Sequence, residues 1–156
     1  MGQPNHFRRK SISAQTTKVL VVDDDQSLVA FVRTALEVEE EYEVIDADNG
    51  LTGLSRAYED TPDLIILDVY LPGESGFFVL RNLKSNSKTK DIPVVMLTGI
   101  GRRLGIVFST RDFYDFLGVE PDAYLEKPVD PIFLRLVTGR LLGMDPAVNG
   151  SEAQKN

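Results

Sequence analysis

The chain has 156 residues, of which 42% are apolar and 26% are charged, a composition typical of one globular domain with a buried core. Its formal net charge of −7 disfavours binding to nucleic acid. The chain lacks cysteine and has one histidine, His6, which excludes disulfides and thiolate metal sites and argues against a Ser-His-Asp triad. No apolar run approaches the roughly 20 residues of a membrane span, so we expect no membrane association and a cytoplasmic location.

Apolar patterning predicts five strands that alternate with five helices. Short apolar runs place the strands at residues 19–22, 42–47, 64–67, 92–97 and 123–125. Helical spacing predicts helices at 28–36, 51–58 and 77–83, a loop and one helix within 99–118, and a last helix after Asp130. Asp130 and Pro131 are residue types that begin a helix. The stripe of the second helix starts at Leu51 and that of the last includes Phe133 and Leu136, which we therefore expect to face the core.

Strands that are almost wholly apolar are typical of a parallel sheet covered on both faces. Their alternation with helices predicts a doubly wound α/β domain. We expect this single domain to span residues 18–142, because Gly143 and the polar stretch after it stop the last helix. Residues 1–17 and 143–156 are expected to be flexible tails.

Polar residues follow four of the predicted strands. Three acids, Asp23, Asp24 and Asp25, come after the first strand, and Asp68, Thr98 and Lys127 come after the third, fourth and fifth. Open α/β sheets bind ligands at the carboxyl ends of their strands, so these groups are expected to converge there. Clustered carboxylates need a cation, and oxygen ligands favour Mg²⁺. A carboxylate beside Mg²⁺ can attack phosphorus, and the product's charge could be met by the metal, an ammonium and a hydroxyl.

Each residue also has a plainer interpretation. An acid after a strand often only caps the next helix, and for Asp25 this alternative has about even odds. A single threonine or lysine at a strand end means little, and a Lys-Pro pair usually just ends a strand. The occurrence of all these groups in order, at four separate strand ends, favours a common site.

Four segments together resemble the receiver domain of response regulators in two-component signalling. They are Val21-Val22-Asp23-Asp24-Asp25, Leu67-Asp68-Val69-Tyr70-Leu71-Pro72-Gly73, Met96-Leu97-Thr98-Gly99 and Ala123-Tyr124-Leu125-Glu126-Lys127-Pro128. The resemblance runs from about residue 18 to 142. It implies a flavodoxin-like (βα)5 fold with the strand order 2-1-3-4-5. The chain departs from the family's pattern at Leu71, where methionine is usual, and in a longer stretch between Thr98 and Lys127.

The resemblance also assigns roles to individual residues. It implies that Asp68 is the phosphoacceptor, and that Mg²⁺ is held by Asp23, Asp24, Asp68 and the backbone carbonyl of Tyr70. Thr98 and Lys127 would bind the phosphoryl group. Tyr124 would be an aromatic switch that turns inward when Thr98 binds that group. It further implies a cis peptide bond between Lys127 and Pro128.

The leading functional hypothesis is a stand-alone receiver that takes phosphate from a histidine kinase or phosphotransfer protein. It would signal to a protein partner through the fourth and fifth predicted helices, and a homodimer is compatible with the sequence. Such a domain catalyses only its own phosphorylation and dephosphorylation and is not otherwise an enzyme. The alternatives are an interaction module that is never phosphorylated and an aspartyl-nucleophile phosphatase. The phosphatase needs a second acid two residues after the nucleophile, where this chain has Tyr70.

Overall fold

The computed structural model describes residues 15–38, 40–99 and 118–144. These residues form a five-stranded parallel sheet in the order β2-β1-β3-β4-β5, which confirms the expected flavodoxin-like α/β fold. The strands are β1 (Thr17–Val22), β2 (Tyr42–Ala47), β3 (Leu64–Asp68), β4 (Val94–Thr98) and β5 (Ala123–Glu126). The helices are α1 (Gln26–Leu36), α2 (Gly50–Asp60), α3 (Gly76–Ser85) and α6 (Pro131–Leu141).

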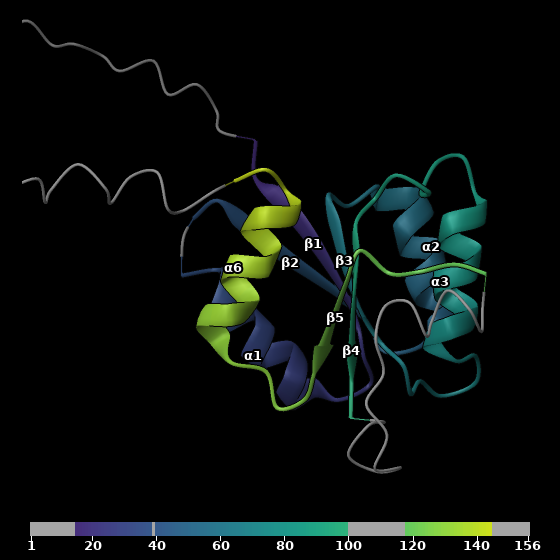
Figure 1. The fold of residues 1–156 in the computed structure, drawn as a ribbon, viewed down its shortest axis with the longest axis horizontal. Helices are drawn as coiled ribbons and strands as arrows, with labels where there is room; N and C mark the ends of the chain where they lie inside the picture. The colour runs from purple at the N-terminus through teal and green to yellow at the C-terminus, as the bar shows by residue number, and fades with distance from the viewer. Residues whose placement is uncertain (1–14, 39, 100–117, 145–156) are drawn as a thin grey trace, which may run out of the picture.

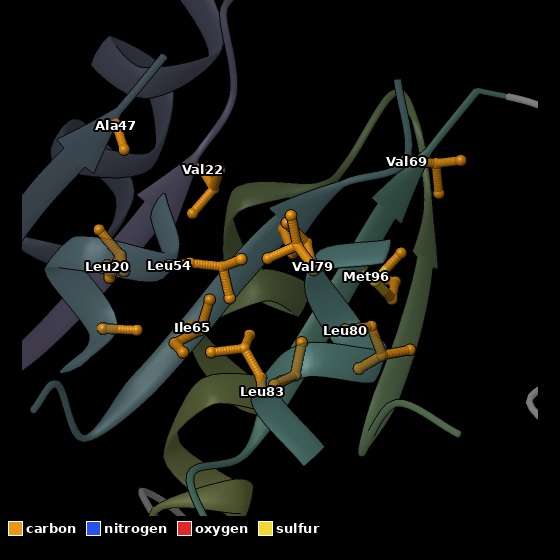
Figure 2. Packing of buried hydrophobic residues seen from close by; sticks show 13 residues of the cluster. Leu20, Val22, Ala47, Leu54, Ile65, Val69, Val79, Leu80, Leu83 and Met96 are labelled. Carbon is orange, nitrogen blue, oxygen red and sulfur yellow. The ribbon is translucent and has the colours of Figure 1, made fainter. Parts of the chain in front are cut away.

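Helices cover both faces of the sheet (Figure 1). α1 and α6 pack on one face, where Val32 and Leu134 meet the side chains of Val19 and Val21. α2 and α3 pack on the other face, against the alternate residues of the same strands. Figure 2 shows this second cluster, in which Leu54, Val79 and Leu80 lie against the sheet. Every residue of β3 and β4 is buried, so the unbroken apolar runs correctly indicated a sheet covered on both sides.

Side-chain caps explain where the helices begin. Asp25, Asn49, Ser75 and Asp130 each accept a hydrogen bond from a backbone N–H in the first turn of α1, α2, α3 and α6. Pro131 follows at the first position of α6. The helix start expected at Asp130 is thus confirmed, and Asp25 does cap a helix, as its plainer interpretation held.

The prediction of which face each helix buries was wrong at three positions. Leu51 is 62% exposed, and α2 approaches the sheet closely at Gly53, where a Cβ would lie 2.8 Å from a methyl of Val22. In α6, Phe133 and Leu136 are about half exposed, and Leu134 is buried instead. The sequence of α6 is apolar almost all round, so its periodicity does not select one face.

β1 begins at Thr17, whose N–H donates to the carbonyl of Glu41, one residue before the expected start of the domain. At the other end, α6 stops before Gly143, which has a φ of +70° and so suits a helix C-terminus. The loop and helix expected within 99–118 fall almost wholly outside the described residues. Among those residues, no helix is long and apolar enough to cross a membrane.

Candidate active site at the carboxyl ends of the strands

The candidate residues meet at one edge of the sheet because all its strands are parallel. Asp68 is the last residue of β3 and Thr98 the last of β4, while Asp23 directly follows β1 and Lys127 directly follows β5. Neighbouring strands are held in register, with Val22 beside Leu67 and Asp68 beside Leu97. The topology therefore brings together residues separated by more than a hundred positions in sequence.

Three acids form a group that could hold a divalent cation. One carboxylate oxygen from each of Asp23, Asp24 and Asp68 lies within 4.8 Å of the others. Asp23 is 1% exposed and Asp68 is 7% exposed, whereas Asp24 is open to solvent. The N–H of Asp25 donates to Asp23 Oδ1 over 2.8 Å, which fixes one oxygen of that carboxylate. A set of carboxylate oxygens with one side open to water fits Mg²⁺, which binds through few protein ligands and keeps several waters.

Lys127 bridges the two buried acids. Its Nζ lies 3.2 Å from Asp23 Oδ2 and 3.3 Å from Asp68 Oδ2. Its backbone N–H donates to the carbonyl of Thr98 over 2.9 Å, so the lysine is anchored to the end of β4. The peptide bond between Lys127 and Pro128 is cis, as the resemblance implied. The ammonium thus partly compensates a buried negative charge and stands beside the carboxylate expected to react.

Burial changes the protonation of Asp23. Loss of water around this carboxyl raises its pKa from 3.8 to about 6, and the negative charge of Asp68 acts in the same direction. The hydrogen bond from Asp25 and the charge of Lys127 lower the pKa but do not cancel the rise. In the absence of a metal, part of the Asp23 population therefore carries a proton in mildly acidic solution.

Thr98 and Tyr124 are in contact. Thr98 is fully buried, and a side-chain hydrogen bond joins it to Tyr124 on β5. Burial, followed by the negative charge of Glu126, raises the pKa of the Tyr124 phenol, which therefore stays protonated at neutral pH. A phosphoryl group that recruited the Thr98 hydroxyl would compete with this hydrogen bond. The contact supplies a physical link between the site and Tyr124.

Tyr70 follows Asp68 by two residues. Its backbone N–H is 3.4 Å from Asp68 Oδ1, and its side chain is 51% exposed. The role of its carbonyl as a metal ligand stays a prediction.

Gly76 is a site residue that the sequence reasoning missed. Its N–H donates to the carbonyl of Val69, and a Cβ at this position would lie only 2.0 Å from the carbonyl oxygen of Asp68. The start of α3 can therefore approach the end of β3 only because residue 76 has no side chain. A glycine directly before the helix predicted at 77–83 was the available signal, because glycine is the residue that allows the close approach of two backbones.

Comparison with known proteins agrees with the geometry. A family model described as the response regulator receiver domain matches residues 19–137. The chain is 39% identical over 123 residues to response regulator PleD of Caulobacter vibrioides, a match that covers 76% of this chain and 24% of PleD. It is 36% identical over 113 residues to the transcriptional regulator RpaA of Synechocystis, covering 72% of this chain and 44% of RpaA. The chain thus spans less than half the length of these relatives.

Solved structures show the same fold. A putative response regulator from Chloroflexus aurantiacus superposes with a TM-score of 0.71 at 29% identity, covering 83% of this chain and 99% of that one. The chemotaxis response regulator CheY4 of Vibrio cholerae gives a TM-score of 0.68 at 29% identity, covering 81% of this chain and 99% of the other.

Proposed function

Since this chain belongs to the response regulator receiver domain family, we propose that it is a phosphorylation switch that accepts a phosphoryl group on Asp68. One observation carries the proposal. The nearly buried carboxylate of Asp68 lies 3.3 Å from the Lys127 ammonium, within a three-acid group that fits a divalent cation. Receiver domains generally bind Mg²⁺, and we propose that Asp23, Asp24 and Asp68 hold it here.

The proposed reaction is a phosphoryl transfer from a phosphohistidine. A carboxylate oxygen of Asp68 forms a bond to phosphorus, the phosphorus–nitrogen bond breaks, and the departing imidazole takes up a proton. Lys127 is placed to bind one phosphoryl oxygen without leaving the acids. Mg²⁺ held by Asp23, Asp24 and Asp68 would supply positive charge that offsets the charge of the phosphoryl oxygens.

The proposed switch begins at Thr98. Its hydroxyl would turn from Tyr124 to a phosphoryl oxygen, which is the stronger acceptor. The Tyr124 ring would then change position and alter the surface that a partner meets. Beryllofluoride with Mg²⁺ is expected to shift the NMR resonances of Tyr124 as well as those beside Asp68. Shifts confined to Asp23, Asp24 and Asp68 would contradict this switch.

Intact mass spectrometry tests the phosphoacceptor directly. The purified chain is incubated with Mg²⁺ and a small acyl phosphate or amidophosphate. We expect a mass increment of one phosphate, lost in Asp68→Asn and kept in the matched control Asp91→Asn, which changes an exposed acid before the start of β4, the end opposite Thr98. No increment in the wild-type chain would favour an interaction module that is never phosphorylated.

Several narrower statements belong to the same proposal. The phosphoryl donor is a histidine kinase or phosphotransfer protein, and the output is a contact with a protein partner. The domain catalyses only its own phosphorylation and dephosphorylation, since a tyrosine stands where an aspartyl phosphatase needs its second acid. The stand-alone arrangement stays a prediction, because the curated relatives are longer proteins. The cytoplasmic location also stays a prediction.

A further inference from the structure

Among the described residues, β2 is an edge strand of the sheet, with β1 on one side only. The carbonyls of Glu41 and Ala47 accept hydrogen bonds from Thr17 and Asp23, and so face the β1 side. In a strand, the N–H and C=O of one residue point to the same edge and successive residues alternate between edges, so the backbone polar groups of Val44 and Asp46 face away from β1. Outward N–H and C=O groups of an edge strand are a template for pairing with another chain.

In this protein, side chains at the two neighbouring helices make hydrogen bonds to these outward backbone groups of β2. Directly after α1, Glu37 Oε1 accepts the hydrogen bond of the Val44 N–H over 3.0 Å. Arg33 donates from Nη1 to the carbonyl of Val44 and from Nη2 to the carboxylate of Asp46, both over 2.6 Å. From α2, Arg56 Nη1 donates to the carbonyl of Asp46 over 2.8 Å. α1 and α2 cover opposite faces of the sheet (Figure 1), so the edge is held from both sides.

Ion pairs along each helix hold these side chains in place. Arg33 pairs with Glu37 at 3.6 Å and Arg56 pairs with Asp60 at 3.7 Å, each one helical turn apart. All four side chains are between 36% and 40% exposed. Ion pairs this exposed add little to folding stability. Their convergence on the outward backbone groups of one strand therefore requires another explanation.

We propose that Arg33, Glu37 and Arg56 form an edge guard, which keeps β2 from pairing with β2 of a second copy of this chain. The unguarded edge would pair with its own equivalent about a two-fold axis, antiparallel, joining two sheets into one. The guard blocks this because three outward backbone groups, the Val44 N–H and the carbonyls of Val44 and Asp46, are already bonded to side chains of their own domain. The proposal does not depend on phosphorylation.

The test removes the α1 part of the guard. The variant Arg33→Ala/Glu37→Ala is compared with the matched control Arg81→Ala/Glu59→Ala, which removes the same two residue types from exposed helix positions. Both are purified without phosphoryl donor, and their mass is measured by light scattering over a range of concentrations. Far-UV circular dichroism checks folding. We expect the guard variant to associate into dimers and the control to keep the mass of the wild type.

Hydrogen exchange at Val44 locates the new contact. In dilute solution its amide should exchange about tenfold faster in the guard variant than in the control, since a hydrogen bond to a charged acceptor is lost. At high concentration the same amide should become protected by strand pairing. A folded variant of unchanged mass would overturn the proposal, as would association that leaves Val44 unprotected. If the double variant does not fold, Glu37→Ala alone frees the Val44 amide, and the same two readouts decide.

Discussion

Lowering the pH should weaken Mg²⁺ binding, because the metal competes with a proton on Asp23. Burial raises the pKa of this carboxyl to about 6, and a ligand must be deprotonated before it can bind a metal. At about pH 5, a carboxyl with that pKa is protonated in about nine molecules in ten. At about pH 7.5 it is almost fully ionised. The apparent affinity for Mg²⁺ should therefore fall roughly tenfold between these two pH values.

Isothermal titration calorimetry measures this directly. Mg²⁺ is titrated at several pH values between about 5 and 7.5, in two buffers whose ionisation enthalpies differ, so that released protons are counted. Near pH 6, about half a proton should be released for each Mg²⁺ bound. The control Asp91→Asn should behave as the wild type does. An affinity that stays constant across this range, with no proton released, would refute the reasoning from the burial of Asp23.

The same shift in pKa makes a prediction about stability without metal. The folded-state pKa of Asp23 lies above its unfolded value of 3.8. The contribution of this carboxyl to folding stability is therefore fully present below pH 3.8 and is lost as the pH rises through about 6. In EDTA at neutral pH, Asp23→Asn should therefore raise the free energy of unfolding, by about 1–3 kcal/mol. Urea denaturation at neutral pH checks this, and a destabilised variant would contradict it.

Three further predictions concern single residues. Gly76→Ala should destabilise the domain by about 1–3 kcal/mol and slow phosphorylation, because its Cβ would lie 2.0 Å from the Asp68 carbonyl oxygen. The control is Gly99→Ala, where a Cβ meets open space. Equal urea midpoints for the two variants would contradict the clash. Thr138→Val should stabilise the domain by about 0.5–2 kcal/mol in thermal denaturation, because the Thr138 hydroxyl is buried without a partner among the described residues; a lower midpoint would count against this. Tyr70→Asn should speed the first-order decay of the phosphorylated protein, since an amide beside the acceptor can orient water, and an unchanged or slower decay would rule out water access at Tyr70 as the limit.

Local pattern was enough for much of the fold and for which polar residues gather at the carboxyl ends of the strands. Unbroken apolar runs such as residues 64–67 correctly indicated strands buried on both faces. Asp130 and Pro131 marked the start of α6 from residue type alone. The order of acid, hydroxyl and ammonium at four strand ends supported a common site, because parallel strands must end at the same edge of a sheet.

Only the tertiary structure decided how each of these residues behaves. Asp23 and Asp24 are adjacent and chemically identical, yet one is buried with a raised pKa and the other is exposed. The difference arises because tertiary packing buries the Asp23 carboxyl and so raises its pKa, although Lys127, 104 positions away in the chain, acts in the opposite direction. Packing between elements distant in sequence also decides three other features: the exposed face of α6, the close approach at Gly76 and the guarded edge of β2. Each depends on which surfaces meet across the sheet, and periodicity reports only neighbours within one helix or strand.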